Sequence, residues 1–99
     1  MAYFVIWSDA AIDNLQTICD GIARRNLDAA KRTGDAILKH VEVLADFPKI
    51  GPAYPRGSQG TLRQITSRPY RIFYDVDESA GTVTVLHIRH GGREEPLQF

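Results

Sequence analysis

The sequence has one cysteine, no long apolar run and no net charge, and each absence excludes a class of protein. Cys19 alone cannot form a disulfide within the chain or build a zinc site from several cysteines. The longest apolar run, at residues 3–7, is far too short to cross a bilayer. No positively charged region or cleavage site precedes it, so we expect no secretory signal, no membrane partner and a cytoplasmic protein.

The charges balance, which argues against a general nucleic-acid-binding protein. Twelve Lys and Arg residues oppose twelve Asp and Glu residues, whereas a protein that coats nucleic acid is strongly basic. The distribution is uneven, since residues 56–74 contain four arginines and no acidic residue. This local excess is compatible with a small surface that binds an anion or a partner protein.

Common catalytic and cofactor motifs are also missing. There is no glycine-rich phosphate loop, no nucleophile elbow and no pair of carboxylates at a credible spacing. His87 and His90 are three residues apart, so on an extended strand they point to opposite faces and make a poor metal site. We therefore expect no cofactor, no metal and no small-molecule substrate.

The first half of the chain predicts a strand and two helices. The run at residues 3–7 is typical of a buried strand. Ser8 can cap a helix that ends near Arg24, with an apolar stripe in which Cys19 is a small core residue. Asn26 can cap a second helix, which two prolines stop. The two helices have almost no loop between them, so they should form an antiparallel hairpin.

The second half predicts three strands after a long loop. Residues 49–60 are rich in Pro, Gly and Ser, and we expect them to be disordered or to contact a partner. β-type runs follow at residues 61–65, 70–76 and 82–89, with connections short enough for antiparallel pairing. The order β, α, α, β, β, β predicts one α+β domain over residues 1–99, with both helices on one face of the sheet. Gly34, inside the second helix, suggests close packing against the first.

Alternation along the strands predicts which side chains point away from the helices. The residues expected to face the helices are Ile72, Tyr74 and Val76, together with Leu86 and Ile88 of the last strand. The residues expected to face outward are Arg71, Phe73, Asp75, His87 and Arg89. A slip of one residue would exchange the two faces.

The outward arginines have two interpretations. The planar guanidinium fork binds phosphate or carboxylate in two places at once, so Arg71, Arg89 and the following Arg93 predict a functional surface. Alternatively, each arginine pairs with a neighbouring acid such as Asp75 and has no further role. His90 could act as a general acid or base near neutral pH, or could fix the following Gly-Gly turn by hydrogen bonding.

Several segments together resemble the RelE/ParE superfamily of type II toxin–antitoxin toxins, often labelled plasmid stabilization proteins. The most specific are RPYRIFYDV and VTVLHIRHGGRE, which are similar to the C-terminal signature of that family, and SDAAIDNLQTI and LADFPKIG add to them. The resemblance covers nearly the whole chain. It implies a helical hairpin packed on an antiparallel sheet, and a small toxin that a cognate antitoxin neutralises by wrapping its surface.

The family divides by target, and this sequence departs from one branch. RelE-like members cut messenger RNA on the ribosome without metal, using lysines, arginines and a C-terminal tyrosine, whereas ParE-like members act on DNA gyrase. Arg71 and Arg93 match two arginines of the family pattern. The lysines of the preceding strand are absent, however, and no tyrosine follows Arg93. Leu62, Arg63 and Gln64 occupy the neighbourhood of those lysines.

The resemblance therefore favours a ParE-like toxin that binds gyrase without catalysing a reaction. Its contacts would come from the C-terminal segment and from Arg71, His87, Arg89 and Arg93, while exposed apolar helix edges would receive the antitoxin. The alternative is a RelE-like mRNA interferase, a metal-independent endonuclease that uses Arg71, Arg93 and His90 on ribosome-bound RNA.

Overall fold

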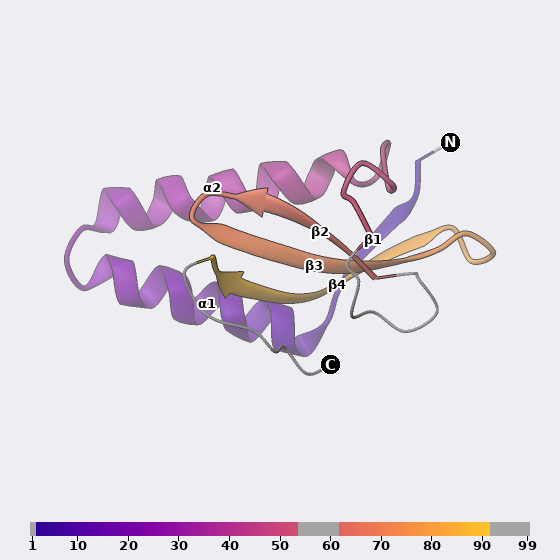
Figure 1. Ribbon diagram of the computed structural model, residues 1–99. Coiled ribbons are helices and arrows are strands. Elements are labelled where there is room, and N and C mark those ends of the chain that lie inside the picture. The colour runs from indigo at the N-terminus through magenta and orange to yellow at the C-terminus, as the bar shows by residue number, and fades with distance from the viewer. Residues whose placement is uncertain (1, 54–61, 92–99) are drawn as a thin grey trace.

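The computed structural model describes residues 2–53 and 62–91, which form two helices and a four-stranded sheet (Figure 1). In chain order the elements are β1 (Phe4–Trp7), α1 (Asp9–Ala23), α2 (Leu27–Val43), β2 (Leu62–Ser67), β3 (Tyr70–Asp77) and β4 (Thr82–His90). The predicted order and the α+β class are confirmed. Most of the loop predicted to be disordered or in contact with a partner, and the C-terminal segment with Arg93, lie outside the described residues.

Both helices begin at the predicted caps. The Ser8 hydroxyl accepts a hydrogen bond from the Ala11 amide at 3.0 Å, and the Asn26 side chain accepts one from the Ala29 amide at 2.9 Å. Each cap satisfies one of the amides that have no partner within the first turn of a helix. Within the described ranges, no helix is both long and apolar enough to span a membrane.

The two helices run antiparallel and pack closely at Gly34 (Figure 1). A Cβ atom added to Gly34 would lie 3.3 Å from the Cys19 sulfur, so even alanine would require the Cys19 side chain to shift slightly. Burial, and secondarily the charge of Asp20, raises the pKa of the Cys19 thiol. Cys19 is therefore a half-buried packing residue, as its place in the helical stripe predicted.

The sheet has the strand order β1-β4-β3-β2. The last three strands form an antiparallel meander, and β1 adds to β4 in parallel at the edge. The prediction that residues 3–7 form a buried strand is wrong, because Phe4 is 77% exposed and Ile6 is 46% exposed. Only alternate side chains of this edge strand, Val5 and Trp7, pack against the core beneath the helices.

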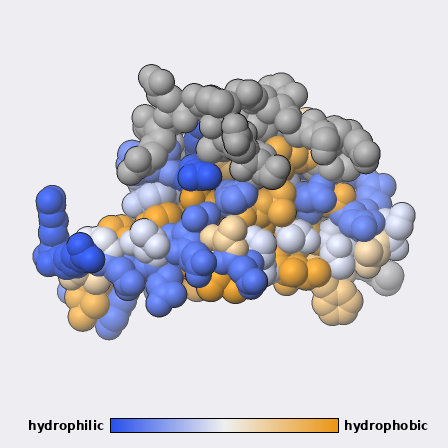
Figure 2. All heavy atoms as spheres, turned by 90° about the horizontal axis from the view of Figure 1, so that it is seen from below, coloured by the Kyte–Doolittle hydropathy of each residue, from blue (hydrophilic) through white to orange (hydrophobic). Residues whose placement is uncertain are grey.

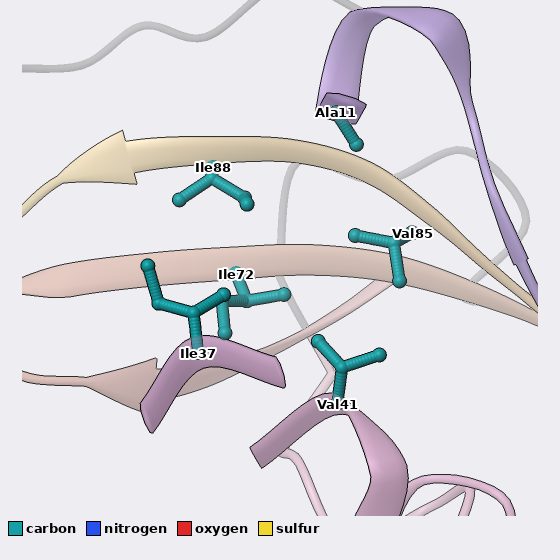
Figure 3. Close-up of a cluster of buried hydrophobic side chains, with 6 residues drawn as sticks. All are labelled: Ala11, Ile37, Val41, Ile72, Val85 and Ile88. Carbon is teal, nitrogen blue, oxygen red and sulfur yellow. The ribbon is translucent and has the colours of Figure 1, made fainter. Parts of the chain in front are cut away.

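The main core lies between the helices and one face of the sheet. Figure 3 shows the side chains of Ile37 and Val41 extending from α2 toward Ile72 and Val85 of the strands. A neighbouring cluster contains Leu44, Tyr74, Val76 and Val83. These clusters confirm the predicted inward direction of the three β3 residues Ile72, Tyr74 and Val76. On the side where α1 lies, hydrophobic atoms form separate patches among hydrophilic ones (Figure 2).

Candidate target-binding face

The sheet face opposite the helices, here called the second face, carries the arginines predicted to face outward. Arg71 of β3 is the register partner of Arg89 of β4, and Phe73 is the register partner of His87. Register partners on neighbouring strands project to the same side of a sheet. The structure therefore brings Arg71, His87 and Arg89 together on one face, and each of these three side chains is half-buried.

A β-bulge changes the prediction for Leu86. The register shifts between Phe73, which is opposite His87, and Tyr74, which is opposite Val85, so Leu86 has no direct partner. Leu86 packs against Leu62 and Phe73 on the second face, and the prediction that it faces the helices is wrong. The extra residue shifts the alternation by one position. Val85 and Ile88 consequently both face the helices, which confirms the inward prediction for Ile88.

Phe73 lies on the second face as predicted, but it is fully buried rather than exposed to solvent. Leu62 and Leu86 pack against it, and the guanidinium carbon of Arg71 lies 5.2 Å from the centre of its ring. A guanidinium over an aromatic ring is a cation–π contact. The Nε atom of Arg71 also donates a hydrogen bond to Gln64 Oε1 at 3.1 Å. Neighbouring strands thus hold Arg71 in a defined orientation.

The second face combines the guanidinium groups of Arg71 and Arg89 with the imidazole of His87 and the carboxylate of Asp75. Burial, and secondarily the charge of Arg89, lowers the pKa of His87, so its imidazole is neutral near neutral pH. The Nε atom of Arg89 and the Oδ1 atom of Asp75 are buried and have no hydrogen-bond partner among the described residues. Two guanidinium groups beside a neutral histidine can bind a carboxylate or a phosphate.

His90 does not join this group. It is the register partner of Tyr70, one position beyond the pair formed by Arg71 and Arg89, so its side chain points to the opposite side of the sheet. The rings of Tyr70 and His90 meet edge to face, with their centroids 5.6 Å apart. The structure therefore separates His90 from Arg71, and these two residues do not form one catalytic centre.

Arg63 has a structural position that the sequence did not predict. It is the register partner of Tyr74 and so lies on the helix side of the sheet. Its Nη1 atom donates to the carbonyl of Gly51 at 2.7 Å, and the Gly51 amide donates to the Tyr74 hydroxyl at 3.0 Å. Arg63 and Tyr74 thus fasten the chain after α2 to the sheet. Burial raises the pKa of Tyr74, so its hydroxyl stays protonated.

A groove between α1 and the end of β4 is a further site that the sequence did not indicate. Its volume is about 680 Å³, and residues of α1, β3 and β4 line it together with Arg25 and Asn26. It could not be predicted from periodicity, because it depends on how α1 lies along the free part of β4. Within residues 2–53 and 62–91, no group of three His, Cys, Asp or Glu residues could hold a metal ion.

Comparison with known proteins identifies a sequence family and several similar folds. The family described as the ParE toxin of type II toxin-antitoxin system, parDE, matches residues 5–95. No curated protein matches the chain significantly in sequence.

The structural likenesses include both RelE and ParE systems. The Mycobacterium tuberculosis toxin-antitoxin complex RelBE2 contains a chain with a TM-score of 0.70 and 20% identity, and the match covers 91% of this chain and 99% of that one. A chain of the chromosomal ParDE system from P. aeruginosa has a TM-score of 0.73 and 18% identity, with 90% and 96% covered. The isolated E. coli RelE toxin has a TM-score of 0.64 and 20% identity, with 95% and 89% covered. Because the sequence identities are only 18–20%, these structures establish the fold of the chain and nothing beyond it.

Proposed function

Because the chain belongs to the ParE toxin family of type II toxin–antitoxin systems, we propose that it acts on DNA gyrase in the cytoplasm and is neutralised by a cognate antitoxin. The toxin binds gyrase through the second face of its sheet, without catalysing a reaction of its own. Arg71, His87 and Arg89 supply contacts there. Arg93, which lies outside the described residues, is proposed to extend this surface.

The direction in which the Arg63 side chain points is the observation that favours gyrase over ribosome-bound RNA as the target. Cleavage of an RNA strand requires several groups that hold the phosphate and move protons. Arg63 is the only basic residue within β2, and it binds the Gly51 carbonyl on the helix side. The β2 residues on the second face are the uncharged Leu62, Gln64 and Thr66. This strand therefore adds no cation to the face where RNA would bind.

The adjacency of Arg71 and Arg89 favours a second candidate function, an mRNA interferase. Two guanidinium groups on neighbouring strands can hold one phosphate, as a metal-independent endonuclease requires. The similarity of the fold to E. coli RelE agrees with this candidate. The position of His90 on the other side of the sheet counts against it, because the proposed acid or base would then lie away from the phosphate.

The antitoxin is proposed to cover apolar side chains on the helices. Ile12 of α1 and Leu27, Leu38 and Val43 of α2 are large hydrophobic residues that the described structure leaves exposed. An antitoxin that covers them would remove this apolar surface from water.

One experiment separates the two targets. The purified toxin is incubated with gyrase and plasmid, and separately with translating ribosomes. Accumulation of cleaved DNA complexes supports the gyrase proposal, and the variant Arg71→Ala should lower it while Arg24→Ala, on the exposed end of α1, should not. RNA cuts at codon positions without any effect on gyrase would replace the proposal with the second candidate. Absence of both activities would indicate a toxin that has lost its target but still binds its antitoxin.

A further inference from the structure

The groove between α1 and the end of β4 begins where α1 stops contacting the strand. The Ser8 hydroxyl donates to the Leu86 carbonyl at 2.9 Å, and the Ile88 amide donates to the Asn14 side chain at 3.0 Å. These two hydrogen bonds give partners to one carbonyl and one amide on the edge of β4 that β1 does not cover. Farther along, α1 and the last residues of β4 border a hollow of about 680 Å³.

The walls of the groove combine apolar side chains with cations. Ile18 and Ile22 of α1 and Ile88 of β4 supply the apolar surface, while Arg25 and Arg89 supply positive charge. No aspartate or glutamate is found among the described lining residues. The described lining therefore combines positive charge with an apolar surface, which is complementary to a ligand with carboxylates and hydrophobic side chains.

Arg89 provides a second, independent indication of an anionic ligand. Its Nε atom is buried and lacks an acceptor among the described residues. A buried charged donor without a partner is costly, and a carboxylate close to the guanidinium would offset that cost.

The shape of the groove suits a polypeptide rather than a small anion. Its helical wall extends from Asn14 to Ile22, which corresponds to roughly 12 Å along the axis of α1, and Arg25 and Asn26 continue the lining beyond the helix end. Gly21 lies near the C-terminal end of this wall, and a Cβ atom added there would meet nothing within 4 Å. The absence of a side chain at Gly21 lets another backbone approach the helix closely.

From these observations we propose that the groove binds a short acidic segment of another protein. Its carboxylates lie against Arg25 and Arg89, and its apolar side chains pack on Ile18 and Ile22. Only the natural source of this segment rests on the proposed function, since in a toxin–antitoxin pair the segment would belong to the antitoxin. The binding itself requires no action on gyrase or on RNA.

The test is a selection of peptides on the whole protein. A displayed library of random peptides of about twelve residues, which as helices would span ~18 Å, is panned against the purified chain. Enriched peptides should contain an excess of Asp and Glu together with large apolar residues. Their affinity, measured by fluorescence anisotropy with synthetic copies, should fall as salt is raised, because exposed charges are screened.

Two groove variants and a matched control locate the binding. Arg25→Glu should weaken the selected peptides by about 10-fold, whereas Arg24→Glu, with the same change in net charge outside the groove lining, should have little effect. Gly21→Gln fills the groove from an exposed helical position and should also weaken binding. Circular dichroism and thermal melting of each variant check that the fold is retained.

Three results would overturn the proposal. These are a failure to enrich any peptide, enrichment without an acidic bias, and equal binding to the Arg24 and Arg25 variants when both are folded. Gyrase and ribosome assays on the same preparation report the proposed function separately. If the protein is inactive in both assays but selects acidic peptides, the proposed function fails and the groove proposal holds. If it is active but selects no acidic peptide, the groove proposal fails and the proposed function holds.

Discussion

Arg71 and Arg89 are register partners on adjacent antiparallel strands, so two like charges stand side by side on the face opposite the helices. Like charges directly opposite each other in a sheet are unfavourable. For Arg71, the hydrogen bond to Gln64 and the contact with the ring of Phe73 offset part of this repulsion. The Nε atom of Arg89, in contrast, has no acceptor among the described residues. An arrangement that opposes stability is more readily explained by binding than by folding.

Replacing Arg89 should therefore separate stability from function. Arg89→Met keeps much of the apolar stem and removes the charge, so the free energy of unfolding should rise by about 0.5 kcal/mol. If the proposed function holds, growth arrest on induction of the toxin should weaken, because Arg89 is one of the contacts proposed for the target. Urea unfolding and a growth assay measure the two effects, with Arg24→Met as the control. A loss of stability in the Arg89 variant would mean that its guanidinium has a stabilising partner.

Gly51 should tolerate no side chain. A Cβ atom at this position would lie 2.3 Å from the Gln64 carbonyl oxygen and 2.7 Å from the Tyr74 hydroxyl. Gly51→Ala should lower the free energy of unfolding by about 1–3 kcal/mol, as overpacking does. Gly21→Ala is the matched control, since its Cβ meets open space and alanine favours a helix by roughly 0.8–1 kcal/mol over glycine. The two substitutions should shift the urea midpoint in opposite directions.

The hydroxyl of Tyr74 should contribute to stability through Gly51. It accepts the Gly51 amide at 3.0 Å in a buried position, so Tyr74→Phe leaves that amide without its acceptor. The expected loss in the free energy of unfolding is about 1–3 kcal/mol. Tyr3→Phe, at a half-buried tyrosine near the start of the chain, serves as the control. Equal small losses in both variants would show that the Gly51 amide finds another acceptor.

Stability should depend on pH through His87. Burial and Arg89 lower its folded pKa below the ordinary value of 6.5. Between the folded pKa and 6.5 the unfolded chain binds more protons than the folded chain, so the free energy of unfolding falls as the pH falls through this window. Above the unfolded pKa this dependence vanishes.

The variant His87→Gln should reduce the pH dependence. Urea unfolding of the wild-type chain and the variant at several pH values from about 7.5 to about 5 measures the change. His40→Gln, at an exposed position of α2, should leave the slope in this range close to that of the wild-type chain. A wild-type slope that persists in the His87 variant would assign the dependence to another group.

Comparison of the predicted and observed elements shows where reasoning from the sequence succeeds. The helix starts at Ser8 and Asn26 were predicted because capping involves groups only three residues apart. The inward direction of Ile72, Tyr74 and Val76 was predicted because alternation along one strand is also local. The close approach of Gly34 to the first helix was predicted from a glycine within an otherwise regular helix, and the structure shows that Cys19 is the residue it meets.

The errors arose where contacts connect distant parts of the chain. The bulge that turns Leu86 away from the helices depends on the pairing of β4 with β3, which alternation within β4 cannot reveal. The exposure of Phe4 depends on the position of β1 at the edge of the sheet, and apolar composition alone suggested a buried strand. The direction of Arg63, for which no prediction was made, follows from the register of β2 on β3 and from the Gly51 carbonyl, twelve residues earlier.

The amino-acid sequence by itself determined the number, type and order of the elements and the family to which the chain belongs. Periodicity, capping and turn residues act over a few positions, so these features can be inferred without coordinates. Only the tertiary structure decided that Arg71, His87 and Arg89 share one face, that His90 lies on the other, and that α1 and β4 enclose a groove. These relationships depend on strand register and helix placement, which result from packing between residues far apart in the chain.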